Sequence, residues 1–220
     1  MTLSLSLLAG LYVVLPFIST WKFTVSRRNL TGPFDHLSTH CSHVPPISAD
    51  EFRQRQQLLA ETLHVLDATA YIAEPGANAL FFGNISETNW HLSERPLLLL
   101  VSPRVSGDGA VYPQISILTP QFEISRAKML AVPADNVTYP AWAEEANPYK
   151  VALSALPPST RCGKIYVDGS LRHFVVDGFQ KAAPNIQVEA APVEIRRLRE
   201  RKSLAELELL KCANEVRHLF

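Results

Sequence analysis

The sequence has few cysteines, few glycines and no excess of charge of either sign. Its three cysteines, Cys41, Cys162 and Cys212, include no C-x-x-C pair, which argues against a disulfide framework or a zinc ribbon and allows at most one bridge within the chain. With 21 basic and 21 acidic side chains the formal net charge is zero, so nucleic acid is disfavoured as a partner. A content of 47% hydrophobic and 19% charged residues excludes collagen, coiled coil and wholesale disorder.

Familiar catalytic motifs are missing as well. The chain contains no P-loop, no G-x-G-x-x-G and no G-x-S-x-G sequence, which removes the common phosphate-binding and serine-hydrolase signatures. Four side chains of types that suit zinc lie within eight residues: His36, His40, Cys41 and His43. We favour the alternative, a flexible polar linker in which histidine is merely frequent, because no second ligand pair follows at zinc-finger spacing.

The N-terminus is apolar. Leu3 to Thr20 carries no charge and is at the lower limit of length for crossing a bilayer. We expect residues 1–21 to be a signal anchor or a signal peptide, forming an apolar helix; a buried core helix is the alternative. The chain would then be held at a membrane by this single segment or enter the secretory pathway, and it would be secreted if the segment is cleaved.

Two signals disagree about the orientation of that segment. Lys22, Arg27 and Arg28 follow it directly, and the positive-inside rule would leave the remainder in the cytosol. Three N-x-[S/T] sequons are candidate glycosylation sites on the lumenal side, at Asn29, Asn84 and Asn136. The sequons together with the apolar N-terminus favour the secretory pathway and a glycoprotein.

A linker and a domain follow. Residues 22–47 include Pro45-Pro46 and show no apolar period, as is typical of a linker. Ser48 and Glu51 form a capping box, which predicts a helix from there to about Leu66. The domain is therefore expected to span residues 48–202.

Short apolar runs and helical patterns alternate through this domain. Turn signals bound the runs, so we expect strands at 70–73, 79–82, 97–101, 115–118, 164–167 and 186–188. Helices are expected at 125–130, after Asn147-Pro148, and at 171–182. The run at 97–101 is apolar at every position, which indicates a strand covered on both faces. Together the pattern predicts an α/β fold, a sheet with helices on its faces.

The C-terminal region differs in charge. Residues 193–202 carry five Arg or Lys with two Glu among them, which favours a solvated helix or hinge with ion pairs. Ser203 and Glu206 form a second capping box, and the helix that begins there continues to Phe220 without a Gly or Pro stop. We expect residues 203–220 to be the first helix of a further domain.

Two positions within the domain are candidates for chemistry or recognition. Asp168-Gly169 follows a predicted strand, where α/β sites often lie, but an Asx-type turn is the favoured interpretation. Trp90 lies in a polar stretch and could recognise a ligand; a ring packed over the sheet edge is favoured.

The segments LHVLDATAYIAEPGANALFFGNIS and RPLLLLVSP resemble the opening of the creatinase and Xaa-Pro aminopeptidase N-terminal domain, and VEIRRLRERKSLAELELLKCANEV resembles the junction to its pita-bread catalytic domain. The resemblance covers roughly Ser48 to Val216. It implies a mixed sheet with flanking helices, of the ribonuclease-H-like type. It also implies homo-oligomer contacts or pairing with a catalytic domain, and a loop at the rim of a substrate pocket, for which Trp90 and Arg95 are the candidates.

The family's hydrolysis of Xaa-Pro bonds requires two divalent metal ions, held by two Asp, one His and two Glu of the pita-bread domain. Beyond Ser203 this chain offers no Asp, and its one His is His218. We therefore expect no catalytic or metal residues and no cofactor in this chain. We expect a non-catalytic domain present without its catalytic half. The alternatives are a longer, active Xaa-Pro aminopeptidase or dipeptidase, with proline-containing peptides as substrates, and a stand-alone binding or regulatory module.

Overall fold

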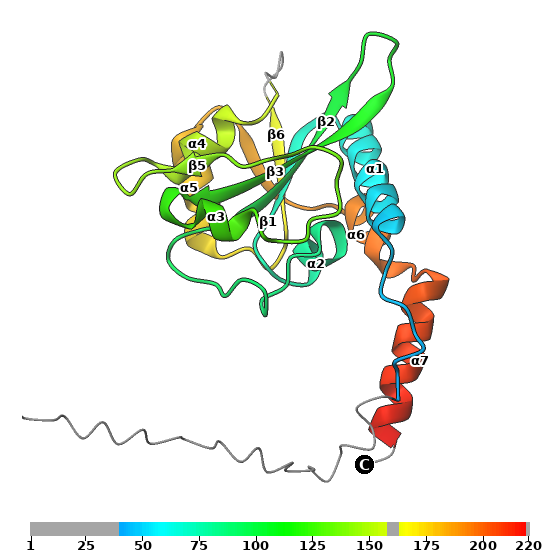
Figure 1. Ribbon diagram of the computed structural model, residues 1–220. Helices are drawn as coiled ribbons and strands as arrows, with labels where there is room; N and C mark the ends of the chain where they lie inside the picture. Colours follow the sequence, from blue (N-terminus) through cyan, green and yellow to red (C-terminus); the bar gives the residue numbers. More distant parts are fainter. Residues whose placement is uncertain (1–39, 158–162, 219–220) are drawn as a thin grey trace, which may run out of the picture. The chain divides into compact units, whose positions relative to one another are not determined.

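The computed structural model describes residues 40–157 and 163–218. Its strands form a mixed sheet in the order β4-β3-β2-β1-β6-β7, with β5 pairing to β3 (Figure 1). β1, β6 and β7 are parallel, whereas β2 is antiparallel to both β1 and β3. The strands are β1 (Ala68–Ala73), β2 (Leu98–Val105), β3 (Val111–Pro120), β4 (Val137–Thr138), β5 (Ala141–Trp142), β6 (Lys164–Val167) and β7 (Gln187–Ala190).

The helices are distributed over the two faces of this sheet. Their bounds are α1 (Ala49–Val65), α2 (Ala77–Gly83), α3 (Ile124–Ala127) after a 3-10 turn (Gln121–Glu123), α4 (Pro148–Ser154), α5 (His173–Ala182), α6 (Val193–Glu200) and α7 (Leu204–His218). Buried side chains of α1, α2 and α6 contribute to one apolar cluster, and those of α4 and α5 to another. This arrangement of a mixed sheet with flanking helices confirms the expected fold class.

The central strand β2 divides these two clusters. Leu99 and Val101 point into the first cluster and Leu98 and Leu100 into the second, because side chains alternate between the faces of a strand. All four are fully shielded from solvent. The expectation of a strand covered on both faces at 97–101 is confirmed.

Both expected capping boxes are at helix starts. The Ser48 hydroxyl accepts from the Glu51 amide at 3.2 Å, while the Glu51 carboxylate pairs with Arg55 instead of closing the box. The second box is reciprocal: the Ser203 hydroxyl accepts from the Glu206 amide at 3.1 Å, and the Glu206 carboxylate accepts from the Ser203 amide at 3.0 Å. Each bond satisfies an amide that has no partner within its helix.

The strand expected at 79–82 is wrong, because these residues lie in helix α2. The helix ends at Asn84, whose φ of 56° is the left-handed conformation of a C-cap. Helical geometry places Phe81 and Phe82 in the core with ring centroids 4.9 Å apart and leaves Leu80 43% exposed. Periodicity cannot separate a short apolar strand from a buried helical turn.

Other expected elements differ in length only. The helix expected at 125–130 is the single turn α3, since beyond it Met129 and Leu130 donate to carbonyls three residues back. That tighter path packs Leu130 and Val132 against the first cluster. The strand at 164–167 and the helices after Asn147 and near 171–182 are confirmed.

The charged stretch 193–202 contains helix α6. Ile195 is buried and Leu198 packs against the first cluster, so one face of the helix contributes to the core. The guanidinium of Arg199 donates to Asn78 Oδ1 at 2.8 Å. The stretch is therefore a helix packed on the domain and not a free hinge.

None of the helices within 40–157 and 163–218 is both long enough and apolar enough to cross a membrane. The apolar helix and membrane segment expected at 1–21, and the sequon at Asn29, lie outside the described residues.

Candidate functional site

The two rim candidates from the sequence have different environments. Trp90 is 3% exposed and belongs to the first apolar cluster, with the Arg126 guanidinium 4.1 Å from its ring. Arg95 is partly exposed and forms a two-pronged hydrogen bond with Glu144, at 2.8 and 3.2 Å. That bond raises the pKa of Arg95. Trp90 thus anchors its loop, and Arg95 offers the accessible charge.

A buried ion pair attaches the same loop to the end of the sheet. Glu74 directly follows β1 and is 6% exposed. Its carboxylate accepts from the Arg172 guanidinium and from the Arg172 amide, the latter at 3.1 Å. The guanidinium also donates to the Ser93 carbonyl at 2.7 Å. Arg172 therefore joins β1, the start of α5 and the loop that carries Arg95.

A second polar cluster lies at the end of the neighbouring parallel strand, β6. Asp168 is 6% exposed, and one of its oxygens accepts from the Ser170 amide at 3.1 Å and from Asn78 Nδ2 at 2.7 Å. The first bond is an Asx-type turn, which is the interpretation favoured from the sequence. Burial, and secondarily the charge of Asp168, raises the pKa of the Tyr71 hydroxyl, whereas Arg199 lowers it.

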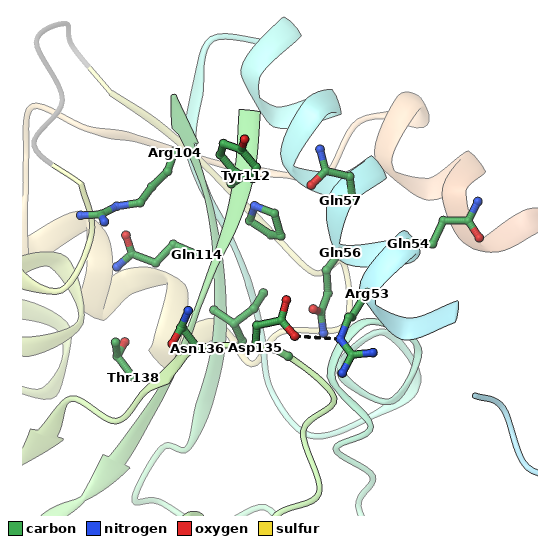
Figure 2. A pocket seen from close by; sticks show the side chains of 13 residues that line it. Arg53, Gln54, Gln56, Gln57, Arg104, Tyr112, Gln114, Asp135, Asn136 and Thr138 are labelled. Carbon is green, nitrogen blue, oxygen red and sulfur yellow. Dashed lines mark hydrogen bonds and ion pairs between the residues drawn. The ribbon is translucent and has the colours of Figure 1, made fainter. Parts of the chain in front are cut away.

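A cavity of about 700 Å³ lies between α1 and the β2–β3 hairpin, and Figure 2 shows the side chains that line it. Arg53 on α1 donates to Asp135 at 2.9 Å across one side of it. Arg104 forms no ion pair with a described residue, and Gln114 Oε1 is buried without a hydrogen-bond partner. The described lining is polar on one side, with Arg53, Arg104 and Gln114 among its residues, so the cavity offers donors and positive charge for a polar ligand.

An apolar groove of about 550 Å³ lies between α1, α2 and α7. At its base Arg55 is 8% exposed, with its guanidinium 4.1 Å from the Phe81 ring. Arg55 pairs with Glu51 and, at 3.4 Å, with Glu206 of α7. The groove is lined by Pro46, Ile47, Phe52, Arg55, Ala77, Leu80, Phe81, Asn84, Arg199, Lys202, Glu206, Leu209 and Leu210.

Helix α7 exposes apolar side chains beside this groove. Leu204, Leu207 and Leu210 are 81%, 41% and 47% exposed. Between Leu204 and Glu215, Cys212 is the single buried residue. The apolar face expected for a helix that begins a further domain is therefore present without a covering partner among the described residues.

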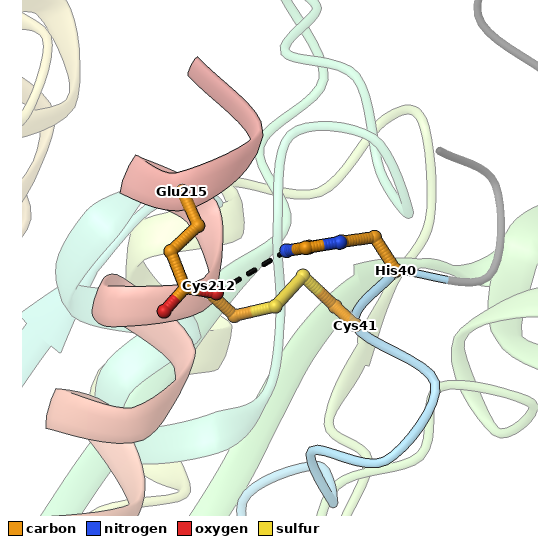
Figure 3. Close-up of a disulfide and its surroundings, with 4 residues drawn as sticks. All are labelled: His40, Cys41, Cys212 and Glu215. Carbon is orange, nitrogen blue, oxygen red and sulfur yellow. Dashed lines mark hydrogen bonds and ion pairs between the residues drawn. A yellow bond between two sulfur atoms is a disulfide. The ribbon is translucent and has the colours of Figure 1, made fainter. Parts of the chain in front are cut away.

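Cys212 is bonded to Cys41, so the described end of the linker is attached to α7 (Figure 3). The sequence allowed one internal bridge but gave no indication of this pairing, because 171 residues separate the two cysteines. His40 lies beside the bridge, with Nε2 3.2 Å from Glu215 Oε2. Of the four linker residues considered as zinc ligands, Cys41 has its sulfur bonded to Cys212, and His36 lies outside the described residues.

Two of the three sequons can be placed. Asn136 is exposed at the mouth of the cavity in Figure 2. Asn84 is half-buried, and its Nδ2 donates to the Ala131 carbonyl at 3.0 Å. Glycosylation at these sites stays a prediction.

No family model matches the chain. It is 33% identical over 180 residues to an uncharacterized peptidase of Schizosaccharomyces pombe. The matched region covers 78% of this chain and 39% of the relative. Its fold is similar to dipeptidase PepE from Mycobacterium ulcerans, with a TM-score of 0.59 and 18% identity over 74% of this chain and 40% of that one.

A second solved structure matches the domain alone. The proline dipeptidase from Streptococcus agalactiae gives a TM-score of 0.50 and 18% identity, over 66% of this chain and 98% of the solved chain. The chain thus spans about two fifths of the length of the yeast relative and of the Mycobacterium dipeptidase, whereas the Streptococcus structure is almost wholly matched.

Proposed function

We propose that this chain, which has the creatinase/prolidase N-terminal fold that its sequence resembles, acts as the non-catalytic N-terminal domain of an Xaa-Pro-peptidase-like protein. The S. pombe relative and the Mycobacterium dipeptidase are each about two and a half times as long as the region they share with it. In the family that the sequence resembles, hydrolysis is performed by the other domain. The role proposed here is to bind that domain and to contribute a loop to the rim of its substrate pocket.

The observation that carries the proposal is the uncovered apolar surface of α7 and the adjoining groove. Burying one leucine side chain stabilises an interface by about 1.5–3 kcal/mol, and Leu204, Leu207 and Leu210 are all available. The buried Arg55 fixes the start of α7 through Glu206, so this surface is held in place before a partner binds. A pre-positioned apolar surface is what a stable domain interface requires.

The binding role is tested by association in trans. The full chain is mixed with the part of the S. pombe relative that lies outside the matched region, and the complex is measured by analytical ultracentrifugation. We expect Leu207→Asp with Leu210→Asp to weaken the complex at least about tenfold, since two buried leucines are lost and two charges are desolvated.

The matched control changes polar neighbours on the same helix, Glu208→Ala with Lys211→Ala, and should leave the affinity within about twofold. If the unmodified chain forms no complex, or if the control weakens it as much as the aspartate pair, the interface assignment is wrong.

The non-catalytic assignment has a separate assay. The purified chain is incubated with Xaa-Pro dipeptides and Mn²⁺, Co²⁺ or Zn²⁺, and free proline is measured with and without a chelator. We expect no release above the buffer rate. Chelator-sensitive cleavage by this chain alone would overturn the assignment and favour an enzyme complete within these residues.

At the pocket rim, the proposal now rests on Arg95. Trp90 is enclosed in the core, so its expected role is to hold the loop, while Arg95 is close enough to the surface to contact a peptide. In a reconstituted complex, Arg95→Ala should raise KM with little change in kcat, because a rim contact binds substrate and transition state alike. Lys181→Ala, an exposed change elsewhere, is the control.

For location, we propose the secretory pathway. A disulfide is typical of oxidising compartments, and the exposed sequon at Asn136 is accessible to glycosylation. These two features favour the lumenal side over the cytosolic side that Lys22, Arg27 and Arg28 indicate. Endoglycosidase treatment of the native protein should increase its gel mobility; an unchanged band would favour the cytosolic orientation.

A further inference from the structure

The surroundings of the disulfide contain more metal-binding side chains than a structural bridge needs. His40 precedes one cysteine, and Glu215 follows the other by one helical turn. We refer to these four residues as the Cys-His-Glu cluster: His40, Cys41, Cys212 and Glu215. The donor atoms of His40, Cys212 and Glu215 all lie within 4.8 Å of one another, and the Cys41 sulfur is bonded to that of Cys212 (Figure 3).

We propose that reduction of the disulfide converts the Cys-His-Glu cluster into a zinc site. Zinc binds thiolates at about 2.3 Å and imidazole nitrogen or carboxylate oxygen at about 2.0–2.2 Å in a tetrahedron. Neighbouring ligand atoms of such a tetrahedron are about 3.3–3.8 Å apart, so the side chains need to move by only about 1 Å. Two sulfurs, one nitrogen and one oxygen supply the four ligands that a closed structural site requires.

The oxidised chain cannot use this site, because a bonded sulfur is not a thiolate. A dithiol reductant supplies two electrons and two protons and becomes a disulfide itself; the Cys41–Cys212 bond breaks and two thiols form. Zinc then binds the two thiolates, and the thiol protons are released to solvent. The cluster therefore has two exclusive states, a covalent bridge and a metal-bridged form.

The surroundings suit an exchangeable ion. Cys212 is buried, which shields the metal-sulfur bond, whereas the side chains of His40 and Glu215 are 33% and 63% exposed and leave a path for zinc. Two thiolates and one carboxylate exceed the charge of Zn²⁺ by one, and the nearby Lys211 and Glu208, which line the same small pocket, carry opposite charges.

The consequence is that the segment before α1 stays attached to α7 in either redox environment. In the oxidised state the link is covalent. In the reduced state the metal joins residues of the linker to residues 171 positions further along the chain, because His40 and Cys41 come from one element and the other two ligands from the other. The surface that α7 presents to a partner is then maintained when the bridge is lost.

The test uses the full 220-residue chain with Cys162→Ser, so that Cys41 and Cys212 are its only thiols. The chain is reduced with a phosphine, and Zn²⁺ affinity is measured by competition with a chromophoric chelator. We expect one equivalent of zinc per reduced chain and at least about 100-fold weaker binding to the oxidised chain. Replacement of zinc by Co²⁺ should give the thiolate-to-metal absorption and the visible bands of a tetrahedral site.

Single changes distinguish the ligands from their neighbours. Cys212→Ser and His40→Ala should each weaken zinc binding by at least about 100-fold, because loss of even an outer-shell partner costs about 10- to 100-fold. Glu215→Gln should weaken it about tenfold, since the amide oxygen is a poorer ligand. His43→Ala is the matched control: His43 lines the same small pocket but is not part of the cluster, and its removal should change affinity less than about twofold.

Three results would overturn the proposal. These are reduced chain that binds no stoichiometric zinc, oxidised chain that binds it equally well, or a His43→Ala variant that loses as much affinity as His40→Ala. His40→Ala and Glu215→Gln change partly exposed side chains, so their circular dichroism should match that of the parent and a loss of binding cannot be ascribed to unfolding.

Discussion

The ion pair between Glu74 and Arg172 gives a sharp prediction about stability. Replacing Arg172 by Met removes the guanidinium but keeps much of the apolar stem. Glu74, whose side chain is 6% exposed, then loses the partner that contacts both of its oxygens, and the Ser93 carbonyl loses a donor. The backbone amide of residue 172 still donates to Glu74, so the carboxylate keeps one hydrogen bond.

Breaking a buried pair by removing one partner costs about 3–5 kcal/mol. Arg172 is 30% exposed on its side chain, which lets water reach the vacated site and places the expected loss of unfolding free energy at about 3 kcal/mol. The matched control lies on α5, the helix that directly follows Arg172: Lys181→Met removes the exposed pair with Asp177, whose side chains are 75% and 42% exposed. Pairs of this kind contribute about 0.3–0.5 kcal/mol.

Urea unfolding followed by circular dichroism measures both variants. We expect the midpoint to fall in Arg172→Met with an unchanged slope, and to stay nearly constant in Lys181→Met. The double variant Glu74→Gln with Arg172→Met should recover part of the loss, because no charge is then left unpaired. A loss under about 0.5 kcal/mol in Arg172→Met would refute the claim that this pair joins β1, α5 and the loop.

Four further changes can be measured in the same way or by NMR. Cys41→Ser should lower the unfolding free energy in non-reducing buffer by about 2–4 kcal/mol, with about 5 kcal/mol as the chain-entropy limit for so long a loop. Gly178→Ala should destabilise by about 1–2 kcal/mol, since its Cβ would lie 2.1 Å from a ring carbon of the tyrosine on α4, whereas Gly107→Ala, with open space around it, should be neutral or slightly stabilising. The hydrogen bond from the Ser106 hydroxyl lowers the pKa of Asp108. A carboxyl pKa that is lower in the folded than in the unfolded chain stabilises the native state at pH values above the unfolded pKa, and this stabilisation is lost as the pH falls through the folded pKa. Ser106→Ala should therefore return the pKa of Asp108, measured by NMR, toward about 4.

Local chemistry explains which elements could be predicted from the sequence. The runs at 97–101 and 165–167 are apolar, short and preceded by Pro or Gly within two residues, and each lies in an expected strand. Ser48 and Ser203 predict the starts of their helices because the capping hydrogen bond joins residues only three positions apart. In each case the deciding interaction lies within a few residues.

The failures are decided by contacts that a local pattern cannot contain. Residues 79–82 are helical because Phe81 and Phe82 reach the core against Tyr71, which a run of four apolar letters does not specify. The partner of Cys41 is 171 residues away, and the partner of Glu74 is 98 residues away. The sequence offered only a weaker signal for the Glu74 pair: Glu74 is an acidic residue directly after a strand, at the end of the sheet where polar groups gather.

These polar groups hold the loops at the ends of β1 and β6. Asp168 is occupied by Asn78 and its own turn, and Glu74 by Arg172. Both oxygens of Glu74 accept from Arg172, and one oxygen of Asp168 accepts from Asn78 and Ser170, so these bonds fix the loops after β1 and β6. The strand-end network therefore positions these two loops.

The side chains that remain available for contact with a partner lie elsewhere in the domain. Among the described residues, the leucines of α7 are uncovered and Arg104 has no ion pair, which agrees with the proposed binding of another domain on that helix. Arg55 of α1 and Glu206 of α7 form an ion pair. A partner bound on α7 would therefore also affect how α1 packs in the domain. Arg55→Met should consequently weaken association in trans more than it weakens the domain itself. Equal losses in both would show that Arg55 acts only through the stability of the domain and would contradict this prediction.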